Sequence, residues 1–289
     1  MARNAPIDGA ARGATLKERR TPMADQHQRY LNERTGELER RAARADYWSL
    51  TRGPWYGFLF ALPILALYEV LAGVYGRVVV NGADGILSRW LIPLMDILGT
   101  GRLGALVGLT VLAGLGCWAA HRHQFGVSDE ARVRKSYFIG MLIESSLYAL
   151  LFGAVVNYVL RAVWPLPALQ VGGSYGGPVF NFAMSLGAGL YEELFFRVIL
   201  MGGLALLLHH VVRVPVVWSW IVAALTSSLI FSAFHYVGNM GDVFSMHSFL
   251  YRFIAGLLLA AIYGLRGFGI AVWTHALYDV LVMVLLGGG

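Results

Sequence analysis

Apolar residues recur along most of this 289-residue chain in runs of about 18 residues or longer, divided by short polar segments. A run of this length can cross a hydrocarbon core of ~30 Å as a helix that rises ~1.5 Å per residue. Seven runs have this length: 55–76, 103–120, 137–160, 180–208, 214–236, 247–265 and 268–286. The pattern therefore predicts an all-α fold, a polytopic bundle of transmembrane helices.

An eighth apolar segment, 86–98, is shorter than the others and contains Arg89 and Asp96. A short apolar stretch with charges is more typical of an interfacial or re-entrant helix than of a full crossing. The bundle is therefore expected to have seven or eight spans.

The first 54 residues differ in character from the rest. They hold 18 of the 40 charged residues, although the whole chain is 57% apolar and only 14% charged. The segment 26–46 could be helical but carries no sustained apolar stripe, so we expect a flexible or partly helical tail. From residue 55 onward the chain is too poor in charge for a water-soluble surface and too apolar for a disordered chain. A basic tail of this kind is typical of a cytoplasmic flank held against anionic lipid, and it does not indicate nucleic-acid binding.

Arginine and lysine in the loops indicate the orientation in the membrane. The tail has eleven and the loop 121–136 has four, so both are expected on the cytoplasmic side. Arg77, Arg89 and Arg102 lie between them and weaken the contrast. The Gly- and Pro-containing loop 161–178 is expected on the opposite side. Arginine outnumbers lysine 21 to 2, which favours a GC-rich genome and hence a bacterial inner membrane, with the N-terminus cytoplasmic.

Ionisable residues within a span cost ~2.5–3.5 kcal/mol each on insertion scales, so they are the first candidates for function. The fourth span contains Glu192, Glu193 and Arg197. Glu193 and Arg197 are four residues apart, so they share a helical face and can pair, while Glu192 points about 100° away. Two further acids, Glu69 and Glu144, lie in other spans. On the Glu-Glu-Arg motif alone, the charges could also be neutralised only for insertion, or line a water-filled transport cavity.

Two later spans contain polar residues at the same four-residue spacing. Phe231 precedes His235 near the end of the fifth span, and His275 precedes Asp279 in the seventh. Each alone could be a hydrogen-bonded structural residue, but together with the glutamates a joint site is the simpler explanation. Peptide hydrolysis requires a group that takes a proton from water and a donor that stabilises the oxyanion. This set contains both.

Three motifs thus occur in order along the chain: Glu-Glu-x-x-x-Arg at 192–197, Phe-x-x-x-His at 231–235 and His-x-x-x-Asp at 275–279. Their order resembles the CAAX-protease and bacteriocin-processing family of intramembrane proteases, also called the Abi family. The stretch from Phe253 that reads Phe-Ile-Ala-Gly-Leu is similar to the last helical hairpin of that family. The resemblance covers about residues 137–286 as a protease core. It leaves 1–54 as a tail and 55–136 as an accessory transmembrane region.

The resemblance implies an endopeptidase whose site lies inside the membrane. The implied site residues are Glu192, Glu193, Arg197, His235, His275 and Asp279. Glu192 would be the general base that activates water, helped by His235, and Glu193 with Arg197 would hold the shape of the site. The third motif would lie near the oxyanion. That motif ends in Asn or Asp in the family, and an ionised Asp279 cannot donate a hydrogen bond as Asn can.

The family has also been described as metalloproteases, and glutamate, histidine and aspartate are all possible zinc ligands. If zinc binds, Glu192, His235 and His275 are the expected ligands. No His-Glu-x-x-His helix is present. A glutamate mechanism without metal explains the paired Glu-Glu-Arg motif at least as well, so we favour a reaction without a cofactor.

The expected partners are the lipid bilayer and a membrane-associated peptide or protein substrate. A prenylated C-terminus, a bacteriocin leader and a sorting signal would all fit. The alternative function is a non-catalytic membrane protein, a transporter or an immunity factor, in which the same residues form a proton or ion path. One geometric conflict accompanies the joint site. If the fifth and seventh spans start at the same level, His235 lies ~32 Å from that level and His275 only ~10 Å.

Overall fold

The computed structural model describes residues 22–43, 45–75, 82–126, 132–164, 177–238 and 241–286. Within these ranges the regular structure is entirely helical, which confirms the predicted all-α class. The predicted loop 161–178 falls mostly outside the described residues, as does the first part of the tail.

Six helical stretches are long and apolar enough to cross a membrane. They are α3 (Pro54–Val74), α5 (Arg102–Phe125), α6 (Lys135–Val163), α9 (Val216–Phe234), α10 (Met246–Arg266) and α11 (Phe268–Val280) with its continuation η3 (Leu281–Leu286). Each coincides with a predicted apolar run to within a few residues. Their outer faces carry exposed leucines, such as Leu112 on α5 and Leu150 on α6, which suit contact with lipid tails.

The predicted fourth span, 180–208, is helical throughout, but its winding changes along its length. It consists of α7 (Pro178–Gly187), η1 (Ala188–Glu192), η2 (Leu194–Met201) and α8 (Gly202–His210), of which η1 and η2 have π-helical winding. Taken singly, none of the four is long enough to count as a candidate span, so six candidate spans are counted among the described residues where seven or eight spans were predicted. Residues 178–210 are nonetheless helical without interruption. Turns of π-helix occur often at functional sites, and here they contain the Glu-Glu-Arg motif.

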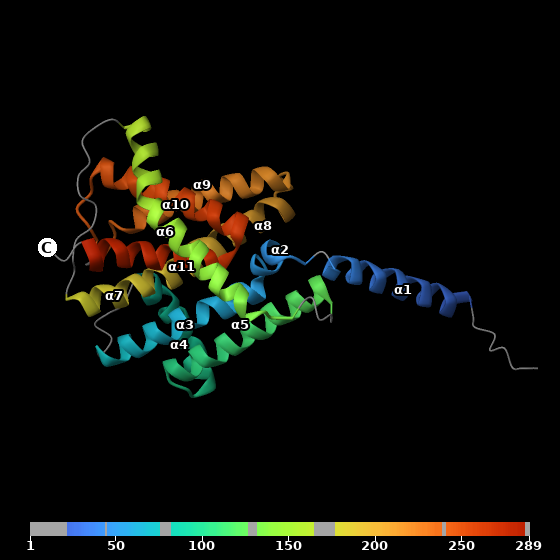
Figure 1. Ribbon diagram of the computed structural model, residues 1–289. Helices are drawn as coiled ribbons and strands as arrows, with labels where there is room; N and C mark the ends of the chain where they lie inside the picture. Colours follow the sequence, from blue (N-terminus) through green and yellow to red (C-terminus); the bar gives the residue numbers. More distant parts are fainter. Residues whose placement is uncertain are drawn as a thin grey trace, which may run out of the picture.

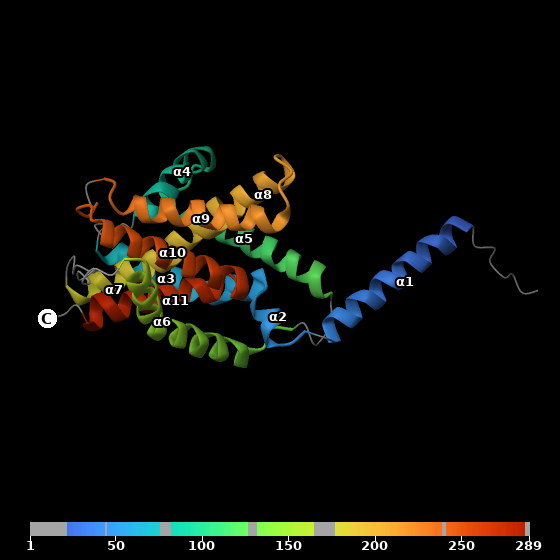
Figure 2. The same cartoon turned by 90° about the horizontal axis from the view of Figure 1, so that it is seen from above.

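The short eighth segment forms α4 (Gly82–Leu98), which is not among the candidate spans. In the tail, α1 (Pro22–Ala43) extends away from the bundle (Figures 1 and 2), and α2 (Tyr47–Thr51) begins where the bundle begins. Asp46 caps α2 by accepting a hydrogen bond from the Ser49 amide at 2.9 Å, and this bond lowers the pKa of the Asp46 carboxyl.

Helix α11 is the element around which the others pack, with α3, α6, α7, α10 and η1 in contact with it (Figure 1). Trp273 of α11 donates to the Phe60 carbonyl of α3 at 2.6 Å. On another side, a Cβ placed on Gly189 of η1 would lie 2.5 Å from the Cβ of Ala276. Only glycine permits this close approach, which brings the π-helical turn against the middle of α11.

The structure also resolves the conflict between the levels of the two histidines. Helices α9 and α11 run in the same direction (Figures 1 and 2), and the rings of Phe231 and His275 lie 6.1 Å apart between centroids. Phe231 is 15 residues into its helix and His275 only 7, so at ~1.5 Å per residue α9 begins ~12 Å before α11. The assumption that both helices begin at the same level was wrong, and the end of α9 meets the middle of α11.

Candidate active site

The structure brings the three motifs to one place inside the bundle. Glu192 is in η1, Glu193 lies between η1 and η2, and Arg197 is in η2. His235 follows the end of α9, and His275 with Asp279 lies on α11. Three parts of the chain that are distant in sequence therefore meet where α11 passes the π-helical turns.

Glu193 is the centre of the charged contacts. It is fully buried, its Oε1 accepts a hydrogen bond from His275 Nδ1 at 2.9 Å, and its Oε2 forms an ion pair with Arg197 Nε at 3.3 Å. The four-residue spacing predicted the pair with Arg197. It did not predict the bond to His275, which joins residues 82 positions apart. Both oxygens of Glu193 are thus occupied by cationic or donor groups.

Arg197 holds the π-helical turn to its neighbours. It is completely buried, its Nη2 donates to the Gly256 carbonyl of α10 at 3.4 Å, and its guanidinium lies 4.8 Å from the ring centroid of Phe231. The contact with the ring face is a cation–π interaction. Gly256 belongs to the Phe-Ile-Ala-Gly-Leu stretch that the sequence singled out, but nothing in the sequence indicated that its carbonyl is a partner of Arg197.

His275 has a carboxylate at each ring nitrogen. Nδ1 bonds Glu193, and Nε2 faces Asp279 Oδ2 at 3.5 Å. An imidazole can donate to both carboxylates only when both nitrogens carry hydrogen. The contact with Asp279 is long for a hydrogen bond, so Nε2 can turn to a closer acceptor.

His235 has the opposite arrangement. Its Nδ1 lies 2.8 Å from the Phe231 carbonyl oxygen, which can only accept, so the hydrogen is assigned to Nδ1. In the neutral ring Nε2 then carries a lone pair. His235 and His275 pack near the same ring, Phe231, with centroid distances of 4.9 Å and 6.1 Å.

Glu192 is the last residue of η1 and is 6% exposed. Its carboxylate lies within range of direct charge interaction with His235, His275 and Asp279. Glu192 therefore lies near both histidines, and its charge also acts on Arg197. Glu193 beside it contacts Arg197 and His275 directly.

The alternative that the sequence left open is a zinc site with Glu192, His235 and His275 as ligands. Across the described ranges, no three His, Cys, Asp or Glu side chains are grouped as they would be around a metal ion. His275 could become a ligand only by giving up a carboxylate at one nitrogen. Independence from metal stays a prediction.

Comparison with known proteins yields one match. Residues 175–281 match the family model described as Type II CAAX prenyl endopeptidase Rce1-like, and this segment contains all three motifs. No curated protein and no solved structure matches the chain. The match confirms the resemblance predicted from the motifs. Together with the six apolar helices, it supports an integral membrane protein in which residues 175–281 are similar to the CAAX prenyl endopeptidase family.

Proposed function

We propose that this chain, whose residues 175–281 match the Rce1-like family, hydrolyses a peptide bond of a membrane-associated substrate with water that Glu192 activates. The observation that supports this assignment most is that the two neighbouring glutamates have different contacts. Glu193 has both oxygens in contact with Arg197 and His275, whereas Glu192 lies near enough to His235, His275 and Arg197 for their charges to interact. Of the two, Glu192 is therefore the one suited to take a proton from water.

In the proposed reaction, a water molecule lies between Glu192 and Nε2 of His235. Glu192 removes one proton as the water oxygen attacks the carbonyl carbon of the substrate. The oxyanion that forms accepts a hydrogen bond from His275 Nε2, which turns from its long contact with Asp279. Glu192 then gives the proton to the leaving nitrogen as the carbon–nitrogen bond breaks, and the carboxylate is restored.

The other residues act through these three. Arg197 and Glu193 hold His275 by its Nδ1 and fix the π-helical turn against α10, so that the donor is preorganised before the substrate binds. Before the substrate binds, Asp279 faces the other ring nitrogen of His275, Nε2, which then donates to the oxyanion instead. None of these steps requires a metal ion.

The substrate class is a peptide or protein at the membrane, because the site lies among apolar helices. The family description names prenyl substrates, so the first substrate to test is a peptide with a farnesylated Cys-aliphatic-aliphatic-X terminus. We further infer a cytoplasmic N-terminus in a bacterial inner membrane from the arginine distribution.

The test uses the full chain reconstituted in liposomes with that peptide, its unprenylated counterpart and a leader-type peptide. Cleavage of any of them by the wild type, and not by Glu192→Gln, supports the proposal. A purified and folded wild type that cleaves none of them, or a Glu192→Gln variant with full activity, would overturn it.

A further inference from the structure

A second buried charge cluster lies outside the segment that matches the family. Arg102 of α5 pairs with Glu69 of α3 at 3.0 Å and with Asp84 of α4 at 2.8 Å. Asp84 also accepts from the hydroxyls of Tyr68 at 2.9 Å and Ser88 at 2.8 Å. In the sequence, Glu69 belonged to none of the three motifs, and Arg102 only weakened the charge contrast that indicates the membrane orientation. In the fold they are partners, and one arginine joins the three accessory helices α3, α4 and α5.

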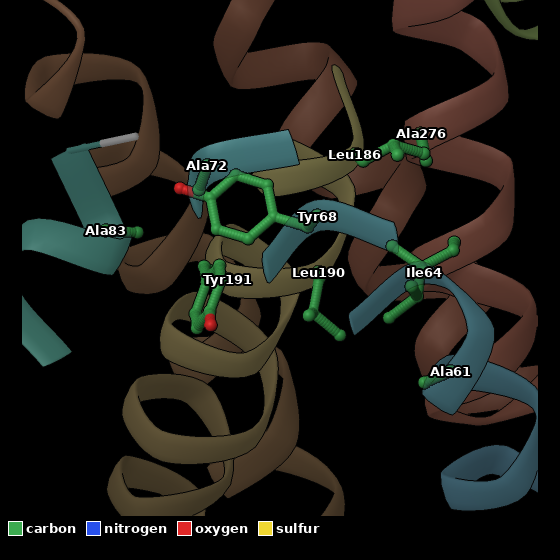
Figure 3. Packing of buried hydrophobic residues seen from close by; sticks show 10 residues of the cluster. Ala61, Ile64, Tyr68, Ala72, Ala83, Leu186, Leu190, Tyr191 and Ala276 are labelled. Carbon is green, nitrogen blue, oxygen red and sulfur yellow. The ribbon is translucent and has the colours of Figure 1, made fainter. Parts of the chain in front are cut away.

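A tyrosine links this cluster to the active site. The hydroxyl of Tyr191 donates to Glu69 Oε1 at 2.7 Å, and Tyr191 is the residue before Glu192 in η1. Its side chain is 4% exposed and packs edge-on against Tyr68 of α3, with 5.2 Å between ring centroids (Figure 3). The phenol therefore ties the π-helical turn to a charged group of the accessory helices.

The turn is held on its other side by α11. Gly189 contacts Ala276, the residue after His275, so closely that a Cβ on the glycine would lie 2.5 Å from the alanine Cβ. Backbone contact thus fixes η1 toward α11, and the bond from Tyr191 fixes it toward α3. The direction in which Glu192 points depends on both contacts, because it follows Tyr191 directly in the same turn.

We propose that Tyr191 and Glu69 are positioning residues, through which the accessory helices aim Glu192 at His235 and His275. This inference rests on the proposed role of Glu192. A hydrogen bond to a charged partner is among the stronger ones in a protein, and the cluster around Arg102 holds that partner in place. The accessory region then influences catalysis by positioning Glu192, although it contributes no group that touches the substrate.

The first test is Tyr191→Phe, which removes one hydroxyl and keeps the ring. We expect kcat to fall about 10- to 100-fold with KM unchanged, because a misplacement of ~1 Å can reduce catalysis by ~100-fold. Glu69→Gln keeps an acceptor but loses the charge, so it should lower kcat in the same direction and by less.

The matched control is Tyr148→Phe. The Tyr148 hydroxyl also donates to a glutamate that is paired with an arginine, Glu144, at 2.9 Å, but it does not adjoin an active-site residue. The two substitutions remove the same chemical group from the same kind of partner. Tyr148→Phe should lower the Tm about as much as Tyr191→Phe and leave kcat at the wild-type value.

A second readout does not depend on cleavage. In protein labelled with ¹⁵N-histidine, the ring resonances of His235 and His275, assigned with His→Gln variants, report the position of Glu192. Tyr191→Phe should shift them and Tyr148→Phe should not. Unchanged resonances and unchanged kcat in Tyr191→Phe would overturn the inference. A wild type without any protease activity would overturn only the proposed function, and the resonances would still decide whether Tyr191 positions the site.

Discussion

Two of the glutamate–arginine pairs among the described residues, Glu144–Arg266 and Glu193–Arg197, differ in how completely their hydrogen bonds are satisfied. The Glu144–Arg266 pair, which we call the end clamp, joins α6 to the end of α10 and to α2. Its contacts involve two bonds between the pair, at 2.5 and 2.8 Å, together with Tyr47, Tyr148, Thr51 and the Trp48 carbonyl. The guanidinium also lies 4.2 Å from the Trp48 ring centroid.

The Glu193–Arg197 pair in the active site is sparser. Arg197 makes one hydrogen bond, to Gly256. Its Nε has only the 3.3 Å ion-pair contact with Glu193, and its Nη1 finds no hydrogen-bond partner among the described residues although the side chain is fully buried. A saturated pair fixes the fold, whereas donors left unsatisfied in a native interior call for another explanation, such as a catalytic role. The same two residue types can therefore stabilise the fold or form part of a catalytic site, and the hydrogen bonds around each pair indicate which role it has.

The largest effect is expected where the chemistry lies. Glu192→Gln keeps the size of the side chain and removes the ability to accept a proton, so kcat/KM should fall by ~10²–10⁴-fold. Thermal stability in detergent should stay near that of the wild type. Glu144→Gln is the counterpart in the end clamp, and we expect it to lower stability while the folded fraction keeps its activity per molecule. Equal loss of activity in both would erase the distinction between the pairs.

Removing the arginines sharpens the comparison. Arg266→Ala and Arg197→Ala each strand a buried carboxylate, which typically costs ~3–5 kcal/mol. Arg266→Ala should lower only the folded yield. Arg197→Ala should lower both the folded yield and the activity per folded molecule. Thermal melts and cleavage rates of the two variants measure this. Normal stability with normal activity in Arg197→Ala would show that its guanidinium does not belong to the site.

A small effect is expected at the cap of α2, beside the end clamp. The Ser49 amide lowers the pKa of Asp46 in the folded chain, so this contribution to stability is complete above the unfolded pKa of about 4. It is lost as the pH falls through the lowered folded value. Asp46→Ala should therefore flatten the acid side of the stability curve slightly. An identical acid profile in wild type and variant would argue against the cap.

Metal removal should have no effect on the rate of cleavage. Dialysis against strong chelators is expected to leave turnover intact, and elemental analysis should find far less than one zinc per chain. Stoichiometric zinc, with activity lost on its removal and restored on its return, would contradict the metal-free mechanism.

The sequence predicted the parts of this fold that depend on local pattern. Six of the seven predicted apolar runs coincide with candidate spans, because length and hydropathy decide whether a helix can cross a bilayer. The π-helical winding at 188–201 was not predicted, because it belongs to the packing of η1 against α3 and α11 rather than to any residue pattern.

The same division holds for the candidate site. The four-residue spacing predicted that Glu193 pairs with Arg197. It could not predict that Glu193 bonds His275 or that Tyr191 bonds Glu69, since those partners are 82 and 122 residues apart. Such contacts depend on chain topology, and the local patterns of a single sequence do not reveal topology.

The central claim is that water activated by Glu192 attacks the peptide bond directly. The most direct measurement is a single turnover in H₂¹⁸O, with enzyme in excess over peptide and mass analysis of the new carboxyl terminus. If water attacks directly, the product of the first turnover carries one ¹⁸O atom. Product with only ¹⁶O in that first turnover would mean that a carboxylate of the protein attacked first and gave up its own oxygen, which would contradict the role of Glu192 as a base.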